Sequence, residues 1–156
     1  RTNAIINNTD FAPTIIEMAG GIRPDYMQGH SFKSILETGE APDNWQQSTY
    51  YRYWMHMADL HNNPAHFGIR TKRYKLIFYY GRHRKDTSAD NETPAAWEFY
   101  DLQKDPREMQ NEYENTEYKN VVLRLKKQLK EKRVELNEQD TGFPHIQEVI
   151  NNHWND

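Results

Sequence analysis

Apolar residues in the first part of the chain follow a helical period twice, each time between a capping residue and a glycine. The first predicted helix begins at Asp10, an N-cap residue type, and ends at Gly20. The second begins at Ser31 and ends at Gly39. The apolar positions are Ile15, Ile16, Met18 and Ala19 in the first helix and Phe32, Ile35 and Leu36 in the second. They have few apolar partners nearby, so we expect their core to lie in residues that precede this sequence.

Four segments have the alternating or aromatic pattern of β-strands, at 50–54, 65–71, 74–80 and 97–102. In the third segment, one predicted face carries Tyr74, Leu76, Phe78 and Tyr80, and the other carries Lys75, Ile77 and Tyr79. Short connections between the segments favour an antiparallel sheet. The polar segment 40–47, which contains Pro42, separates the strands from the two helices and is the predicted domain boundary.

From Thr116 the apolar period changes to steps of three and four residues. The positions are Tyr118, Val121, Val122, Leu125, Leu129 and Leu136, with Lys, Arg and Glu between them. This pattern predicts an amphipathic helix that packs one stripe on the sheet. The apolar residues of the tail, 142–156, are expected to fold back onto this body or onto a neighbouring domain. The predicted class is α+β: a small four-stranded antiparallel sheet packed by a long C-terminal amphipathic helix and preceded by two short helices.

Composition narrows the classes of function. The 156 residues suffice for a domain-sized core, but only 36% are hydrophobic and the mean hydropathy is -1.09. Aromatic residues, at 13%, compensate by burying large areas. The net charge of -3 gives no basic surface for nucleic acid, and no apolar run is long enough to span a membrane.

Cysteine usage and the first residues add two further expectations. The chain has no cysteine, which excludes disulfides, thiolate metal sites and a cysteine nucleophile within these residues. It begins at Arg1 instead of Met and shows no signal-peptide pattern, which favours a truncated or processed chain.

Three histidines between the first two predicted strands are the main candidates for chemistry: His56, His61 and His66. Steps of five residues neither share a helical face nor match the spacing of zinc sites. A loop metal site made from these three histidines alone is the least favoured interpretation. In the other two, each imidazole is either bonded to backbone or water, or it recognises hydroxyl or anionic oxygens of a substrate. Arg70 supports the second alternative because a guanidinium is a planar fork that matches sulfate or carboxylate. A surface arginine at a strand end is the other interpretation.

The remaining polar and glycine patterns are typical of structural residues and do not indicate a catalytic site. No serine lies in a nucleophile elbow, and no glycine-rich segment opens a helix as a phosphate loop does. Asp105 precedes Pro106 and is predicted to be a turn residue whose carboxylate bonds nearby N–H groups. Lys72, Arg73, Lys75 and the basic run 82–85 are predicted to be a solvated face, with a polyanionic glycan as an alternative partner.

An ordered set of short motifs runs through nearly the whole chain. The motifs are 8–14 (NTDFAPT), 19–20 (AG), 27–32 (MQGHSF), 50–54 (YYRYW), 64–71 (PAHFGIRT), 73–77 (RYKLI), 97–102 (WEFYDL), and Asp105–Pro106 with Glu108 and Asn111. Each motif alone is weak, but the ordered set is specific. In this order the chain resembles the C-terminal third of a sulfatase of the alkaline-phosphatase superfamily, and is most similar to the bacterial arylsulfatases and glycan sulfatases.

The resemblance implies a larger α/β sulfatase fold. Residues 1–45 would be the closing helices and linker of an upstream catalytic domain, and 46–156 a C-terminal subdomain. In that family a Cys or Ser in a Cys/Ser-x-Pro/Ala-x-Arg motif matures to formylglycine, and a calcium ion held by Asp and Asn polarises the sulfate. Nothing in this chain matches either feature. We therefore expect both cofactors in the upstream domain, a sulfuric ester hydrolase as the parent protein, and no activity for this chain alone.

The resemblance also implies that the subdomain walls the active-site cleft and helps to recognise a sulfated sugar or aryl sulfate. The candidates for substrate binding are His66 and Arg70, then His56 and His61, then Trp54 and Asp59. No catalytic residue and no metal ligand is assigned within the chain. The expected partners are the upstream domain and the substrate, without nucleic acid or a membrane span, and the expected location is periplasmic or secreted.

Two alternatives to a sulfatase stay open on the sequence. One is the C-terminal part of a related phosphodiesterase or phosphonate hydrolase, which the upstream nucleophile and metal ligands would distinguish. The other is a stand-alone carbohydrate-binding module.

Overall fold

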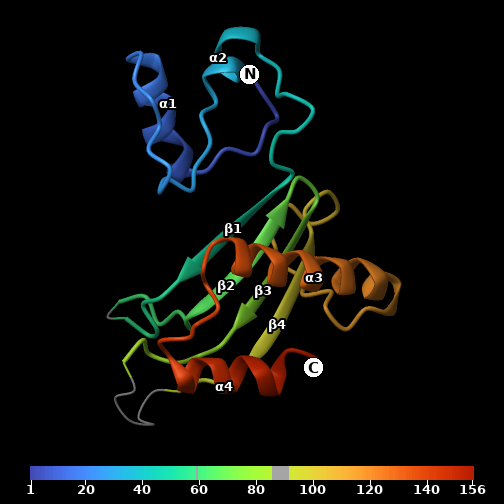
Figure 1. Cartoon of the computed structure of the whole chain (residues 1–156). Coiled ribbons are helices and arrows are strands. Elements are labelled where there is room, and N and C mark those ends of the chain that lie inside the picture. Colours follow the sequence, from blue (N-terminus) through green and yellow to red (C-terminus); the bar gives the residue numbers. More distant parts are fainter. Residues whose placement is uncertain (59, 86–91) are drawn as a thin grey trace. The chain divides into compact units, whose positions relative to one another are not determined.

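The computed structural model describes residues 1–58, 60–85 and 92–156 (Figure 1). The chain folds into two compact units, Arg1–Thr49 and Tyr50–Asp156. In the described ranges, no helix is long and apolar enough to cross a membrane. The assignment of residues 1–45 to an upstream catalytic domain stays a prediction.

The first unit is built from short helices around a small cluster. It contains η1 (Asn8–Asp10), α1 (Phe11–Met18) and α2 (Lys33–Thr38). Gly39 ends α2 in the left-handed conformation, with φ 80°, as a C-terminal glycine does. The cluster consists of Phe32, Ile35 and Trp45. The Trp45 indole N–H donates to the Ile5 carbonyl at 2.8 Å, which ties the end of this unit to its beginning.

Asp10 occupies the predicted N-cap position, but its side chain does not cap α1. A 3-10 turn precedes the helix, so the buried carboxylate accepts hydrogen bonds from other segments instead. Its oxygens accept from the Asn7 N–H at 2.8 Å, the His30 N–H at 2.8 Å and the Gln46 side-chain amide at 2.7 Å. The carboxylate therefore joins the start, the middle and the end of the first unit.

The second unit is a four-stranded sheet in the order β1-β2-β3-β4. The strands are β1 (Ser48–Tyr53), β2 (His66–Thr71), β3 (Tyr74–Tyr79) and β4 (Ala96–Asp101). β2 pairs antiparallel with β3, β3 pairs antiparallel with β4, and β1 runs opposite to β2 (Figure 1). The predicted antiparallel sheet is confirmed.

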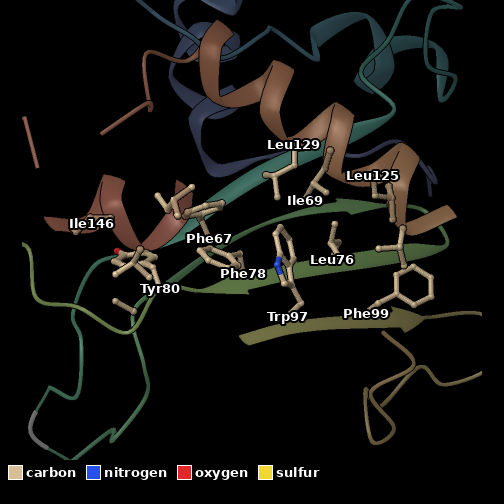
Figure 2. Close-up of a cluster of buried hydrophobic side chains, with 14 of the residues drawn as sticks. Phe67, Ile69, Leu76, Phe78, Tyr80, Trp97, Phe99, Leu125, Leu129 and Ile146 are labelled. Atoms are coloured by element: carbon tan, nitrogen blue, oxygen red, sulfur yellow. The ribbon is translucent and has the colours of Figure 1, made fainter. Parts of the chain in front are cut away.

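Two helices bury one face of this sheet. The turn η2 (Thr116–Tyr118) precedes the long helix α3 (Lys119–Glu135), and α4 (Pro144–His153) comes after α3. Figure 2 shows the apolar side chains of the strands meeting those of both helices. The core members are Ala65, Phe67, Ile69, Leu76, Phe78, Tyr80, Trp97, Phe99, Tyr118, Val122, Leu125, Leu129, Ile146, Val149 and Ile150. The tail predicted to fold back does so as α4, with Pro144 in its first turn.

A buried ionic cluster fixes the loop between α3 and α4. The Arg52 guanidinium contacts Glu138 at 2.9 Å and Asp140 at 2.7 Å, and Arg133 contacts Asp140 at 2.5 Å. Arg52 also lies over the Trp54 ring, 3.5 Å from its centroid, where the ring quadrupole stabilises the cation. The cluster joins β1 to the helical layer.

The end of β4 and the segment after it hold the sheet edge to the η2 turn that precedes α3. The buried Asp101 carboxylate accepts from the Arg73 guanidinium at 2.8 Å, the Tyr118 hydroxyl at 3.2 Å and the Gln103 N–H at 3.2 Å. The Asn111 side chain accepts from the Phe99 N–H at 3.0 Å. Asp101 and Asn111, two residues of the motifs noted in the sequence, therefore stabilise the fold.

Asp105 is a turn residue, as predicted. Its Oδ2 accepts hydrogen bonds from the Met109 N–H at 2.6 Å and the Gln110 N–H at 2.9 Å. Glu108, with φ 55°, reaches back across the sheet to Lys75, whose ammonium lies 2.5 Å from its carboxylate.

We expect Asp101→Ala to lower the free energy of unfolding by about 2–3 kcal/mol, because the Tyr118 hydroxyl would stay buried without its acceptor. Urea unfolding followed by circular dichroism measures this loss. The exposed neighbour Glu117 provides the control: Glu117→Ala should change stability by no more than about 0.5 kcal/mol. Equal losses in the two variants would contradict the assigned role of Asp101.

The stability that Asp101 contributes through its contact with Arg73 depends on pH. The hydrogen bond from Arg73 lowers the pKa of Asp101, so its carboxylate stabilises the fold above the unfolded-state pKa, and this stability is lost as pH falls through the folded value. The difference between wild type and Asp101→Ala should therefore be complete at pH 7 and should narrow below about pH 4. A difference independent of pH would show that the ionised form is not what Asp101 contributes.

Candidate functional site

The face of the sheet opposite the helices carries polar and aromatic side chains, and we call it the tyrosine face. Side chains alternate along each strand, so the neighbours of the core residues project to this side. Its members are Tyr51, Tyr53, His66, Gly68, Arg70, Lys75, Ile77, Tyr79, Glu98 and Tyr100. The predicted division of β3, with Leu76 and Phe78 on the core side and Lys75 and Tyr79 on the other, is thus observed.

His66 lies in an aromatic box on this face. Its ring stacks on Tyr53 with centroids 5.5 Å apart, and the rings of Tyr79 and Tyr51 lie at 4.9 Å and 6.0 Å. Nδ1 lies 2.8 Å from the Pro64 carbonyl, so Nδ1 carries the proton that it donates there. Burial lowers the pKa of His66, which favours the neutral ring. Nε2 is then an acceptor with a fixed orientation.

Arg70 lies two alternate positions further along the same strand, and therefore on the same face as His66. Within residues 1–58, 60–85 and 92–156, its exposed guanidinium has no ion pair or hydrogen bond. Its cross-strand neighbour Lys75 is already paired with Glu108. Arg70 is therefore the cation of this face that is available to an anionic group.

Gly68 lies between His66 and Arg70 and leaves room for Tyr51. A Cβ at Gly68 would meet the Tyr51 hydroxyl at 2.6 Å, so a side chain there would displace this ring. The Tyr51 hydroxyl is buried and makes no hydrogen bond to the described residues, and burial raises its pKa. A neutral hydroxyl thus lies between the imidazole and the guanidinium.

Glu98 organises the far side of the tyrosine face. Its Oε2 accepts hydrogen bonds from the Tyr79 hydroxyl at 3.0 Å and the Tyr100 hydroxyl at 3.0 Å. Burial and this carboxylate raise the pKa of both phenols, so both remain neutral donors. These bonds hold Tyr79 against the His66 ring.

The other candidates lie outside this cluster. His56 is buried in the loop after β1, where its Nδ1 accepts the Ala65 N–H at 3.1 Å and its ring contacts His83. His61 is exposed in the same loop. Trp54 packs against Arg52 and Phe143, and Asp59 lies outside the described residues. The structure brings His66 and Arg70 to one face and leaves His56 and His61 in the loop that leads to it.

The basic run 82–85 is partly neutralised. Arg82 pairs with Glu92 at 3.1 Å, and Arg84 lies over the rings of Trp54 and Phe143, 5.4 Å and 5.3 Å from their centroids. Stacking of a cation on aromatic rings stabilises the loop ends without an anion.

The sequence predicted His66 and Arg70 as candidate binding residues but did not predict the aromatic box around the imidazole. The alternation in Tyr50–Tyr53 was a usable signal, since it places Tyr51 and Tyr53 on one face of β1. The contribution of Tyr79 depends on the register of β3 against β2, in which Tyr79 is opposite His66. The sequence does not specify that register.

Among the described residues, no group of three or more His, Asp and Glu side chains is placed to hold a metal ion. The described residues therefore offer no site that fits the calcium ion implied by the resemblance.

Comparisons of the sequence with known proteins identify one family. Residues 1–135 match the family model described as N-sulphoglucosamine sulphohydrolase, C-terminal. An N-acetylglucosamine-6-O-sulfatase of Bacteroides thetaiotaomicron is 36% identical over 89% of this chain and 23% of its own length. An ulvan-active sulfatase of Formosa agariphila is 30% identical over 82% of this chain and 28% of its own length. The chain thus spans about a quarter of these relatives.

Solved structures show the same architecture. A protein solved in complex with its substrate D-glucosamine-2-N,6-O-disulfate superimposes with a TM-score of 0.72 at 36% identity, over 84% of this chain and 24% of that protein. A phosphonate monoester hydrolase of Agrobacterium radiobacter superimposes with a TM-score of 0.62 over 86% of this chain and 26% of that protein. Its identity of 22% shows the fold alone. From the family match over residues 1–135, the chain belongs to the family of sulfatase C-terminal domains described as N-sulphoglucosamine sulphohydrolase, C-terminal.

Proposed function

We propose that this chain is the C-terminal part of a sulfatase that hydrolyses sulfate esters of glycans, and that its tyrosine face contributes to recognition of the sugar. The proposal rests on the family match and on the names of the relatives, which describe sulfatases of sugar substrates. Because the chain spans 23% and 28% of those two relatives, the proposed reaction takes place in a preceding catalytic domain.

The observation that carries the recognition role is the placement of His66 and Arg70 on one face. A guanidinium can donate two parallel hydrogen bonds to a sulfate or carboxylate group, and Arg70 is not engaged by a described side chain. A neutral imidazole with Nδ1–H held by Pro64 presents Nε2 to a sugar hydroxyl. The two groups together suit a sugar that carries an anion beside a hydroxyl.

The remaining candidates have supporting roles in this proposal. His56 positions the backbone at the start of β2, because its Nδ1 accepts a hydrogen bond from the N–H of Ala65, the residue before His66. His61 is an exposed imidazole that can contact substrate directly. The tyrosines of the box form a wall with neutral hydroxyl donors, as in sugar-binding sites that combine aromatic and polar groups.

The first unit supports attachment to a larger body. Its exposed apolar side chains are Phe11, Ile15, Met18, Ile22, Tyr26 and Leu36, with exposed fractions of 54% to 93%. Apolar side chains gathered on one small unit are normally covered by a partner. We assign this partner to the upstream α/β catalytic domain, with residues 1–45 as its closing helices and linker.

The cofactors and the location follow from the same proposal. Formylglycine and calcium belong to the upstream domain, since the described residues offer no metal cluster and the sequence has no matching motif. A sulfatase that degrades external glycans would be periplasmic or secreted. The alternatives are a phosphonate hydrolase, whose fold this chain shares, and a stand-alone binding module.

The isolated chain is expected to release no sulfate from 4-nitrophenyl sulfate, with or without added calcium, because nucleophile and metal ligands are assigned to the upstream domain. Absorbance of 4-nitrophenol measures turnover. The full-length enzyme serves as positive control. Turnover by the pure chain would overturn the proposal, and a full-length enzyme that cleaves phosphonate esters but no sulfate ester would establish the phosphonate hydrolase instead.

In the full-length enzyme, Arg70→Ala and His66→Ala are each expected to lower kcat/KM on N-acetylglucosamine-6-sulfate by about 10-fold or more. On 4-nitrophenyl sulfate, which lacks the sugar, the loss should stay within about threefold. Lys72→Ala is the matched control, because it removes an exposed cation from the adjacent turn. Equal losses on the two substrates would assign His66 and Arg70 to structure instead of sugar recognition.

An NMR titration of His66 should give a midpoint below 6.5, because burial in the aromatic box disfavours the imidazolium. Tyr53→Ala opens one side of the ring to water and should raise the midpoint toward that value. Tyr26→Ala, which removes an exposed tyrosine of the first unit, should leave it unchanged. Since the folded-state pKa is the lower one, acidification from pH 7 should reduce stability through this group.

A further inference from the structure

A pocket lies between α3 and α4, on the side of the sheet opposite the tyrosine face. Its volume is about 350 Å³. Its lining residues are Lys130, Arg133, Val134, Gln139, Gln147, Ile150, Asn151, Trp154 and Asn155. Six of these nine residues follow position 135, where the match to the family model ends. The pocket is therefore built mostly from the part of the chain beyond that match.

Side-chain amides dominate the polar part of the pocket: Gln139, Gln147, Asn151 and Asn155. Gln147 makes one long hydrogen bond of 3.4 Å to the Gln139 carbonyl. The side chains of Gln139, Asn151 and Asn155 make none to the part of the chain that the structure describes. Each amide offers donors and an acceptor together, and this combination matches the hydroxyl groups of a sugar.

An indole forms part of the apolar wall. The Trp154 ring stacks on the core, with its plane 25° from that of the Phe67 ring. The backbone carbonyl of Trp154 accepts a hydrogen bond from the Lys126 ammonium at 2.6 Å. Ile150 and Val134 complete the apolar surface. The apolar faces of a sugar ring pack on such a surface, and the contacts of Trp154 hold it in place before any ligand binds.

The charge of the pocket is positive. None of the nine lining residues is acidic, and two are cationic. Arg133 is already bound to Asp140, whereas Lys130 is exposed and has no ion pair in the described ranges. The Nε–H of Arg133 is buried without a hydrogen-bond partner in the described ranges, so the inner wall keeps one unused N–H donor. An anionic ligand is favoured over a neutral one.

We propose that this α3–α4 pocket binds a sulfated saccharide unit, with the amides on its hydroxyl groups, Trp154 and Ile150 against its ring, and Lys130 on its sulfate. The volume of about 350 Å³ is at the lower end of the range of small-molecule sites and suits a mono- or disaccharide. The site would hold a further unit of a sulfated glycan, in addition to recognition by the tyrosine face.

The test uses the full-length enzyme and isothermal titration calorimetry with a fully sulfated heparin disaccharide and its unsulfated counterpart. Lys130→Ala and Asn151→Ala should each weaken binding of the sulfated disaccharide at this site about 10-fold, and the unsulfated one should bind more weakly than the sulfated one. Trp154 is kept, since its loss would also open the core. kcat/KM on 4-nitrophenyl sulfate should not change in either variant.

Lys127→Ala is the matched control, because it removes the same charge from the same helix at a residue outside the pocket. Equal weakening by Lys127→Ala would mean diffuse attraction of a polyanion and would overturn the proposal. So would unchanged binding in both pocket variants, or equal binding of the two disaccharides. If the wild-type enzyme cleaved no sulfate ester, the proposed function would fail. The comparison of disaccharide binding between the pocket variants and Lys127→Ala would still show whether the pocket binds a sulfated saccharide.

Discussion

Packing of α3 and α4 on one face of the sheet sets the arrangement of everything else in the second unit. Phe67, Ile69, Leu76 and Leu129 are fully removed from water in this layer. Because strand side chains alternate, each buried residue forces its neighbours to the opposite face. His66 and Arg70 flank Gly68 on the tyrosine face for this reason. The hydrophobic core thus determines on which face these polar groups lie.

Local patterns in the sequence were sufficient for much of this fold. Alternation in the segment of β3 gave the correct division between its two faces, and the helical period from Thr116 gave α3. The class of fold and the family resemblance are confirmed. The tail was expected to fold back, but α4 was not predicted as a helix. A local signal was present, since Ile146, Val149 and Ile150 recur at steps of three and four residues after Pro144.

Contacts between distant residues could not be predicted. The box around His66 needs the register of three strands, and the Asp10 carboxylate needs segments that lie 20 and 36 positions away. Asp101 was recognised as part of a motif, yet its bonds to Arg73 and Tyr118 appear only when β3, β4 and α3 have assembled. Sequence patterns report the local preference of a residue, whereas these side chains act through partners chosen by the fold.

The indole of Trp45 has a consequence for observing how the chain folds. The sequence has four tryptophans, and Trp45 is the one in Arg1–Thr49, whereas Trp54, Trp97 and Trp154 belong to Tyr50–Asp156. Its hydrogen bond to Ile5 and its burial with Phe32 give it surroundings that exist only while the first unit is folded. Replacing Trp45 with Phe would therefore remove the fluorescence of that unit alone. The emission spectrum of the wild type minus that of the Trp45→Phe variant would follow the unfolding of Arg1–Thr49 without interference from Tyr50–Asp156.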